Sequence, residues 1–337
     1  MKYQVVIPVY NGEDVIEACL GSITEQAGAV LGKDYSVLVV DDGSTDATAE
    51  IAARFPVRVI GLGENRGRVV ARLTGAREAP AGKVLFIDSR VTVPRDLIAR
   101  LGQYDSLPAV IMAPRFFENS RQSFFERVFY LIRRKFYGRS VFPVQTEDLI
   151  ISRDNFKRSP KGTTMLLIDR ELFLRLAPER TGKEVNDDTL IFQKLVFAMN
   201  KTLLRTQKLD IVYNPKRRPG QTLRWLFERG VRFSDFYFSP GGYLRGYFNL
   251  CAAASAALML LAFVSYIAYP PALPLAFGLL LVCHCALCVY LTEELTDFAV
   301  LFVTLPAILI TFGAGALARR PRYGTKSSDN QSPVRDP

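Results

Sequence analysis

The chain has 337 residues, of which 49% are hydrophobic, and its 43 Lys and Arg against 33 Asp and Glu give a formal net charge of +10. The charge suits a protein that meets anionic lipid or a phosphate-bearing substrate, and the absence of a nucleic-acid-binding motif in the sequence argues against a nucleic-acid partner. The five cysteines show no disulfide spacing, and Cys283, Cys285 and Cys288 lie with His284 in an apolar run, which favours membrane-buried side chains over a metal cluster.

The first ninety residues alternate short apolar runs with helical stripes. We expect strands near Gln4–Val9, Tyr35–Val40, Val57–Ile60 and Val84–Ile87, separated by helices over Glu13–Ala27, Ala47–Arg54 and Val69–Ala79. Pro8 predicts that the first strand leaves the sheet there, and Thr45 or Asp46 is expected to cap the second helix. The alternation is typical of a right-handed parallel α/β sheet. Because Met1 leads almost directly into the first strand, we expect no signal peptide and a cytoplasmic N-terminal part.

Polar side chains follow each of these predicted strands. Asp41-Asp42 follow the second, a glycine-rich segment with Arg66 follows the third, and Asp88-Ser89-Arg90 follow the fourth. Ligands of open α/β sheets bind at the carboxyl ends of the strands, so these residues are candidates for one site. Arginines there suit phosphate, although the glycine spacing is not the dinucleotide fingerprint. The alternative for Asp41-Asp42 is a helix cap in a solvated turn.

Four of these segments, in this order, resemble the successive motifs of glycosyltransferase family 2. They are Ile7-Pro8-Val9-Tyr10-Asn11, Val40-Asp41-Asp42-Gly43-Ser44-Thr45-Asp46, Asn65-Arg66-Gly67 and Phe86-Ile87-Asp88-Ser89. The resemblance implies an α/β GT-A fold, with a Rossmann-like mixed sheet flanked by helices, and inverting transfer of a sugar from a nucleotide-diphosphate donor. It implies donor-binding residues at Pro8, Tyr10, Glu13, Asp41, Asp42, Arg66, Asp88 and Arg90.

Arg90 departs from the family pattern, which has a second aspartate at that position to help hold a divalent cation. A guanidinium does not bind Mg²⁺ or Mn²⁺, which prefer oxygen ligands. One interpretation is that Arg90 replaces the metal by neutralising the diphosphate directly. Another is that Asp88 retains Mg²⁺ or Mn²⁺ with water while Arg90 points elsewhere. A third is that the site is inactive.

Asp187-Asp188 form a second candidate constellation at the start of a predicted helix. An inverting transfer needs a base for the acceptor hydroxyl, and a carboxylate suits that role. The segment resembles the Glu-Asp motif of the family, which makes Asp188 the base and Asp187 the replacement for the glutamate. The alternative is a charge pair that favours the helix N-terminus. The preceding Lys161–Ile168 resembles the acceptor-side loop and strand of the family.

Gln221-Thr222-Leu223-Arg224-Trp225 resembles the Gln-x-x-Arg-Trp motif of membrane-bound family members. Trp225 offers a flat face for a sugar ring, and Arg224 can meet the charge that develops on the leaving diphosphate. The alternative is that both side chains anchor the helix at a membrane interface.

Two parts of the sequence, one near its middle and one near its C-terminal end, predict contact with a membrane. A basic and aromatic amphipathic helix is expected over Arg121–Phe136, either at the interface or packed on the core. Leu250–Tyr269, Ala272–Leu291 and Phe298–Leu317 each have about the 20 apolar residues that cross a bilayer, the alternative being a buried helical bundle. Three crossings from a cytoplasmic start would place Arg319, Arg320 and Arg322 outside, against the positive-inside rule, so either one segment is re-entrant or the charge bias is overridden.

The sequence therefore predicts four parts: a cytoplasmic GT-A domain over residues 1–220, an interfacial segment over 221–248, about three transmembrane helices over 249–318 and a disordered tail over 319–337. The predicted protein is an inverting, membrane-bound glycosyltransferase with a nucleotide-diphosphate sugar as donor and a lipid or lipid-linked saccharide as acceptor. The alternatives are a processive polysaccharide synthase and a partner subunit that binds nucleotide sugar or lipid without turnover.

Overall fold

The computed structural model describes residues 1–113, 124–137, 148–156, 159–178, 187–214, 219–237, 272–292 and 294–318. The chain divides into two compact units. The sheet unit comprises Met1–Arg121 and Arg133–Lys216, and the helical unit comprises Gln122–Ile132 and Arg217–Pro337.

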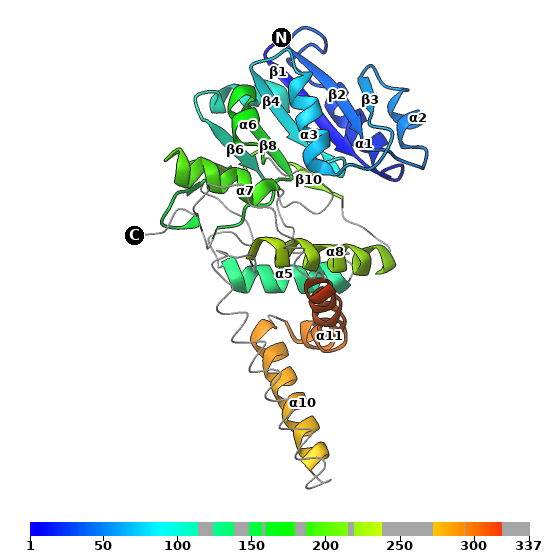
Figure 1. Ribbon diagram of the computed structural model, residues 1–337, viewed down its shortest axis with the longest axis vertical. Coiled ribbons are helices and arrows are strands. Elements are labelled where there is room, and N and C mark those ends of the chain that lie inside the picture. Colours follow the sequence, from blue (N-terminus) through cyan, green and yellow to red (C-terminus); the bar gives the residue numbers. More distant parts are fainter. Residues whose placement is uncertain are drawn as a thin grey trace, which may run out of the picture. The chain divides into compact units, whose positions relative to one another are not determined.

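A mixed eight-stranded sheet forms the centre of the sheet unit (Figure 1). Its strands are β1 (Tyr3–Val9), β2 (Tyr35–Asp41), β3 (Arg58–Gly61), β4 (Lys83–Ile87), β6 (Ala109–Met112), β7 (Leu149–Ile151), β8 (Met165–Asp169) and β9 (Leu203–Thr206). The order is β3-β2-β1-β4-β8-β6-β9-β7, in which β1 to β4 run parallel and β8 is antiparallel to both β4 and β6. A separate ribbon pairs β5 (Val91–Thr92) with β10 (Val212–Tyr213). The predicted α/β class is confirmed, and every strand expected in the first ninety residues is present.

Helices cover both faces of this sheet. They are α1 (Ile16–Thr24), α2 (Thr48–Ala52), α3 (Arg68–Arg77), α4 (Leu97–Arg100), α6 (Arg170–Leu176) and α7 (Asp187–Gln193), with a 3₁₀ turn over Leu101–Tyr104 and a π-helical turn over Lys194–Ala198. Helix α1 is shorter than the Glu13–Ala27 expected. Helix α2 begins at Thr48, whose backbone N–H donates to Asp46 Oδ1 at 3.1 Å, so Asp46 rather than Thr45 binds its first turn.

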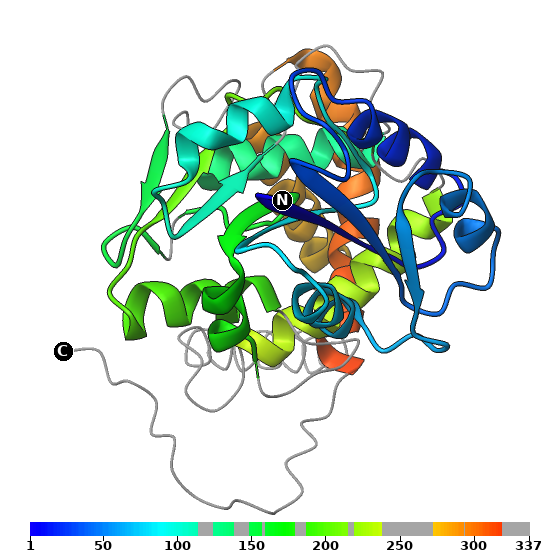
Figure 2. The same cartoon turned by 90° about the horizontal axis from the view of Figure 1, so that it is seen from above.

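Alternate residues of each parallel strand enter different hydrophobic cores. Val5 and Ile7 of β1 pack with Leu20 of α1, whereas Val6 packs with Leu73 of α3 on the other face. Figure 2 shows α1 in dark blue and α3 in lighter blue on opposite sides of these strands. Because the strands are buried on both faces, their sequences are continuous apolar runs, which is why they could be found.

Pro8 does not end the first strand, contrary to the expectation from the sequence. Strand β1 continues to Val9, and Pro8 lies opposite Val40 of β2. Pairing between β1 and β4 ends earlier, with Val6 opposite Phe86. Beyond Val6 this edge of β1 has no ladder partner, so the missing N–H of Pro8 leaves no ladder hydrogen bond unmade.

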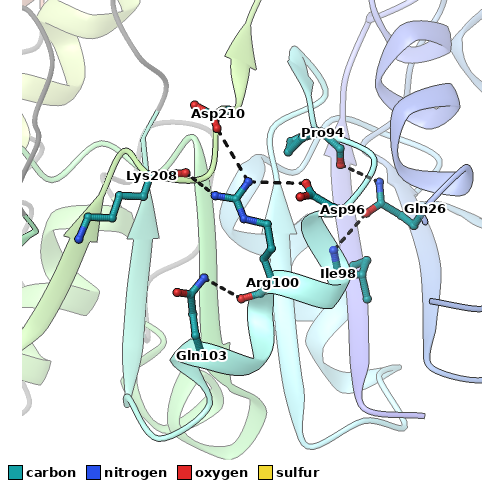
Figure 3. A network of polar contacts seen from close by, with 8 residues as sticks. All are labelled: Gln26, Pro94, Asp96, Ile98, Arg100, Gln103, Lys208 and Asp210. Atoms are coloured by element: carbon teal, nitrogen blue, oxygen red, sulfur yellow. Dashed lines mark hydrogen bonds and ion pairs between the residues drawn. The ribbon is translucent and has the colours of Figure 1, made fainter. Parts of the chain in front are cut away.

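A polar network positions the segment that follows β9 (Figure 3). Arg100, at the end of α4, donates from Nη2 to the carbonyl oxygen of Lys208 at 2.6 Å. The other guanidinium nitrogen lies 3.6 Å from Asp96 and 3.8 Å from Asp210. The two ion pairs contribute little because they are solvent-exposed, but the backbone contact fixes where the chain enters β10. Strand β10 then pairs with β5, which begins three residues after Asp88.

The helical unit contains most of α5 (Phe124–Tyr137), together with α8 (Pro219–Tyr237), α10 (Ala272–Leu291) and α11 (Leu295–Ala318). Three of these helices occur where the sequence predicts them. The predicted segment Leu250–Tyr269, the end of the interfacial segment after Tyr237 and the tail after Ala318 lie outside the described residues.

One helix within the described ranges is long and apolar enough to cross a membrane, as judged by length and composition, and it spans Leu295–Ala316. The apolar stretch of α10 is shorter and spans Phe277–Leu291. The expectation of about three transmembrane helices therefore stays a prediction.

Candidate active site

The loops after β1 and β2 are joined by reciprocal hydrogen bonds. The Asn11 N–H donates to Ser44 Oγ at 2.9 Å, and the Thr45 N–H donates back to Asn11 Oδ1 at 2.9 Å. Asn11 adopts a positive φ of 46°, a conformation that asparagine tolerates better than most residues. Tyr10 is left exposed at the carboxyl end of β1.

A second set of contacts extends the same connection. Glu13 Oε2 accepts the Ala47 N–H at 3.1 Å, and Asp46 Oδ2 accepts the Glu13 N–H at 3.2 Å. Burial alone would raise the pKa of Asp46, but the hydrogen bonds it accepts from Thr48 and Glu13 hold it below its ordinary value. One oxygen of the predicted donor-binding residue Glu13 is therefore engaged in holding the two loops together.

Asp42 is buried, and both of its carboxylate oxygens bind the chain at the start of α3. Oδ1 accepts the Arg66 N–H at 2.7 Å and Oδ2 accepts the Gly67 N–H at 2.8 Å. A carboxylate at the N-terminus of a helix is also favoured by the helix dipole. Gly43 has a φ of +75°, and a Cβ there would lie 2.4 Å from the backbone of Glu64, so only glycine fits where the two loops meet.

Asp41 is equally buried but less engaged than its neighbour. Its Oδ1 accepts the Ser44 N–H at 3.0 Å. Within the described residues, its other oxygen has no hydrogen-bond partner. Of the predicted Asp41-Asp42 pair, Asp41 is therefore the one whose carboxylate can reach a ligand without breaking a contact of the fold.

Asp88 stands at the end of β4, beside the loop after β1. Its backbone N–H donates to the Thr164 carbonyl at 3.0 Å, and its Oδ1 accepts the Arg90 N–H at 3.0 Å. The Arg90 carbonyl in turn accepts the Asn214 N–H at 2.8 Å, which connects this corner to the end of β10. A Cβ built on Gly12 would lie 3.8 Å from Ser89 Oγ, so the ends of β1 and β4 are close.

Arg72, which none of the sequence motifs includes, connects α3 to the loop before β8. It is 2% exposed, donates from Nη2 to Thr163 Oγ1 at 3.0 Å and lies 5.6 Å from the centre of the Phe86 ring. One signal was present in the sequence: an arginine in the buried stripe of α3, between Val69 and Ala76, is unusual unless it has a partner.

Lys161 lies in the same loop before β8. It donates to the carbonyl oxygen of Ser159 at 2.7 Å and to that of Phe156, and its Nζ lies 4.4 Å from the centre of the Phe156 ring. Burial lowers its pKa to about 8. The loop predicted to face the acceptor is thus anchored at Lys161, Thr163 and Thr164.

The donor set for a divalent cation is small. In the described part of the chain no three His, Cys, Asp or Glu side chains come together as a metal-binding group. The carboxylate of Asp88 retains one oxygen without a partner there, and Arg90 supplies no oxygen ligand from its side chain. Magnesium is commonly held by one or two carboxylates together with substrate phosphates and water, so Asp88 fits as a single protein ligand.

The remaining predicted residues lie elsewhere. Arg66 follows β3 and forms an exposed ion pair with Glu64. Asp187 and Asp188 open α7, as expected, but their side chains lie outside the described residues, as does that of Gln221. In the helical unit, Arg224 forms an exposed ion pair with Glu228 at 3.3 Å.

Trp225 is partly exposed on α8 of the helical unit. The guanidinium of Arg229 lies 4.9 Å from its ring. The predicted contact of Trp225 with a sugar stays a prediction. In the sheet unit, Pro8, Tyr10, Asp41 and Asp88 lie together at the ends of β1, β2 and β4. The carboxylate oxygens there that have no partner within the described residues can accept hydrogen bonds from hydroxyl groups or bind a cation.

Comparison with known proteins matches most of the sheet unit to one family. The sequence profile described as Glycosyl transferase family 2 matches residues 4–173. A dolichol-phosphate mannosyltransferase of Pyrococcus furiosus is 31% identical over 105 residues, which is 30% of this chain and 29% of that protein. An undecaprenyl-phosphate 4-deoxy-4-formamido-L-arabinose transferase of Klebsiella pneumoniae is 33% identical over 106 residues, 30% of this chain and 32% of that protein. The matches thus span about a third or less of each relative.

The fold is also similar to that of a solved structure. The mannosyltransferase PcManGT from Pyrobaculum calidifontis, in complex with GDP-Man and Mn²⁺, superposes with a TM-score of 0.58 at 20% sequence identity. The superposition covers 94% of this chain and 87% of that one. At this identity the likeness concerns the fold.

Proposed function

The chain belongs to glycosyl transferase family 2, and from this premise we propose that it is an inverting, membrane-bound glycosyltransferase that moves a sugar from a nucleoside-diphosphate donor to a lipid or lipid-linked acceptor. One observation carries the proposal. The ends of β1, β2 and β4 hold two carboxylates, Asp41 and Asp88, that each keep an oxygen unpaired within the described residues, although Asp41 is 6% exposed. Asp88 is half-buried and neither of these oxygens is sealed from solvent, so both are open to a hydrogen-bond donor or a cation brought by a ligand.

The donor would lie across these strand ends. Asp41 would accept hydrogen bonds from the nucleoside, with Pro8 and Tyr10 against its apolar faces. Asp42 and Glu13 would act by holding the loops in place, because their oxygens already bind Gly67 and Ala47. Such preorganisation lowers the entropic cost of binding.

Asp88 would lie beside the diphosphate. When bound there, Mg²⁺ or Mn²⁺ would neutralise charge on the leaving group, and Asp88 would be its protein ligand. Arg90 would add a second positive charge to the same region, a function that its planar guanidinium suits. The Mn²⁺ in the PcManGT complex makes a divalent cation plausible for this fold.

Asp188 would act as the base. It would take the proton of the acceptor hydroxyl as that oxygen bonds to the anomeric carbon, while the bond from that carbon to the diphosphate oxygen breaks and the nucleoside diphosphate leaves. Asp187 would support its position at the start of α7. Arg224 would meet the charge on the leaving diphosphate, and Trp225 and Gln221 would contact the sugar.

A lipid acceptor is favoured by the apolar C-terminal helices and by the names of the relatives, which act on dolichyl-phosphate and undecaprenyl-phosphate. A site tied to a bilayer meets a lipid-linked substrate at high local concentration. The same helices suit a processive synthase less, because three apolar segments are few for a secretion channel.

The test is the release of nucleoside diphosphate from a panel of nucleotide sugars by the full chain in membranes supplemented with extracted lipid. Asp188→Asn should abolish release, whereas Glu50→Gln, the same kind of charge removal at an exposed position on α2, should leave it unchanged. Donor binding without release by the wild type, unaltered by Asp188→Asn, would instead support a non-catalytic subunit.

A further inference from the structure

The N-terminal end of α11 is held by α5 within the helical unit. Asp297 is 2% exposed, and its two carboxylate oxygens accept hydrogen bonds from Nε and Nη2 of Arg127 at 2.6 and 2.9 Å. The Arg127 guanidinium also lies 5.3 Å from the Tyr130 ring centre. A buried two-point ion pair of this kind fixes the relative position of the two helices.

The C-terminal end of α11 is held by α8, also in the helical unit. A Cβ on Gly230 would lie 2.1 Å from the Phe312 carbonyl oxygen, and a Cβ on Gly315 would lie 2.1 Å from the Phe227 carbonyl oxygen. The two helices are thus in backbone contact, and the pairing of 227 with 315 and of 230 with 312 makes them antiparallel. Figure 2 shows α8 in yellow-green running beside the orange-red α11.

Chain connectivity places α5 and α8 on the same side of a membrane as the sheet. Helix α5 lies in sequence between β6 and β7, two strands of one sheet, so it cannot cross a bilayer. Helix α8 begins six residues after Tyr213 of β10 and carries Arg224, Glu228 and Arg229, too much charge for a crossing segment. Both ends of α11 are therefore attached to helices on the sheet side.

The exposed side chains of α11 lie on one side of the helix. Val303, Leu309 and Ile310 are exposed, whereas Leu301, Leu305 and Ile308 on the opposite side are buried. Phe302, between the two sides, packs on His284 of α10 with ring centres 5.0 Å apart. In α10 the exposed apolar residues surround the helix, as in Phe277, Leu280 and Val282. The first pattern is typical of a helix that lies in the membrane surface, and the second of a helix that lipid surrounds.

We propose that α11 does not cross the membrane but lies in its plane on the face that carries the sheet unit, with the surface of Val303, Leu309 and Ile310 in the lipid. The inference rests on the proposed membrane attachment of the chain and goes beyond it. With the crossing that the sequence predicts over Leu250–Tyr269, outside the described residues, α10 would be the second of two crossings. The C-terminal end of α11 then lies on the face of the sheet unit.

Charge distribution supports this path. With two crossings, Arg319, Arg320 and Arg322 lie on the same face as the basic helices α5 and α8, so the positive-inside rule is satisfied. These arginines would also attract anionic lipid headgroups at that face. Length and composition alone assign α11 as a spanning helix, because neither registers the contacts at its two ends.

The path can be tested with single cysteines in the full chain, labelled by a membrane-impermeant maleimide in spheroplasts and in inverted vesicles. The unaltered chain is the blank, because Cys19 is buried and the other cysteines lie in apolar segments. Pro271→Cys should label in spheroplasts, whereas Ser327→Cys should label at least about tenfold more in inverted vesicles. Strong labelling of Ser327→Cys in spheroplasts would overturn the proposal.

Depth in the bilayer gives an independent measurement. Val303→Trp and Ile310→Trp, each in a Trp225→Phe background, should both be quenched most by lipids brominated close to the headgroups. In a crossing helix both positions would lie within about 7 Å of the bilayer centre, so strongest quenching by lipids brominated near the ends of the acyl chains would overturn the proposal. Release of the chain from membranes by alkaline carbonate would instead refute membrane attachment itself, so the two failures are distinguishable.

Discussion

Asp42 Oδ2 accepts the Gly67 N–H at 2.8 Å, which ties the carboxyl end of β2 to the first turn of α3. With the parallel bond from Arg66, this contact satisfies both oxygens of a buried carboxylate. The adjacent Asp41 uses one oxygen within the described residues. Two neighbouring aspartates of one motif are thus suited to different functions, one holding the fold and the other meeting a ligand.

The difference predicts opposite results for matched substitutions. Asp42→Asn should lower the free energy of unfolding by about 2 kcal/mol. The amide NH₂ cannot accept a hydrogen bond, so one of the two backbone N–H groups would lose its acceptor. Asp41→Asn keeps an acceptor for the Ser44 N–H, so it should change stability by less than about 1 kcal/mol and mainly weaken nucleoside-diphosphate binding. Denaturant unfolding and calorimetric titration measure the two effects. Equal loss of stability in both variants would contradict this division.

The sequence was sufficient to place those candidate residues that lie at the ends of regular elements. Asp41 and Asp88 each follow a continuous apolar run, the pattern of a buried parallel strand. Because parallel strands end at the same edge of a sheet, the sequence predicts that both residues lie at that edge. The use of each oxygen could not be predicted, because the partners of Asp42 are backbone atoms 24 and 25 residues away. Such contacts depend on loop geometry that no periodicity records.

The errors and omissions have similar causes. The expectation for Pro8 was wrong because it required knowledge of where pairing with β4 ends. Arg72 was missed because its partner Thr163 is 91 residues away. Gly230 and Gly315 are poor helix formers in isolation, and their value lies in a contact between two helices that only the fold brings together.

Arg90 leads to a prediction about charge at the diphosphate. Arg90→Ala should weaken nucleoside-diphosphate affinity by about tenfold, the loss expected for one charge-assisted hydrogen bond. Arg95→Ala removes a charge five residues away from an exposed side chain and should leave affinity unchanged. Chelation with EDTA should abolish turnover of the wild type, and added Mn²⁺ or Mg²⁺ should restore it. Full turnover in EDTA would assign neutralisation of the diphosphate to Arg90 alone.

Lys161 predicts a pH dependence of stability. Its pKa in the folded chain is lowered to about 8 by burial, from 10.5. Below about pH 8 folded and unfolded chains both carry the charge, so the cost of burying it is fully present. Between about pH 8 and 10.5 the folded chain loses this proton while the unfolded chain keeps it, so this group makes the free energy of unfolding rise with pH.

Denaturant unfolding at pH 7.5 and 9.5 measures this contribution. The rise should be smaller in Lys161→Met than in the wild type, and Lys201→Met, which removes an exposed lysine, should behave like the wild type. An identical pH response in the wild type and Lys161→Met would show that Lys161 keeps an ordinary pKa.

The contact between α8 and α11 predicts a contrast between two glycines of one helix. Gly315→Ala places a Cβ 2.1 Å from the Phe227 carbonyl oxygen, so the helices must separate, and we expect a loss of about 2 kcal/mol. Gly313→Ala meets nothing within 4 Å and should gain up to about 1 kcal/mol from helix propensity. Thermal unfolding in detergent distinguishes the two, and stabilisation by Gly315→Ala would show that the helices are not in contact.

Arg127 and Asp297 predict a strong coupling between α5 and α11. The side chain of Asp297 is 3% exposed and that of Arg127 19%, so the carboxylate has less access to water once its partner is removed. Arg127→Gln should therefore cost about 3–5 kcal/mol, because it leaves a buried charge without its partner, and Asp297→Asn should cost less. The hydrogen bonds that Arg127 donates to Asp297 also raise the pKa of Arg127, so its guanidinium stays charged. The double variant Arg127→Gln/Asp297→Asn should recover at least about 1 kcal/mol relative to the sum of the single losses, as a double-mutant cycle in detergent measures. Additive losses would mean that the two charges act independently, and α11 would then lose the attachment that holds its N-terminal end on the face of the sheet unit.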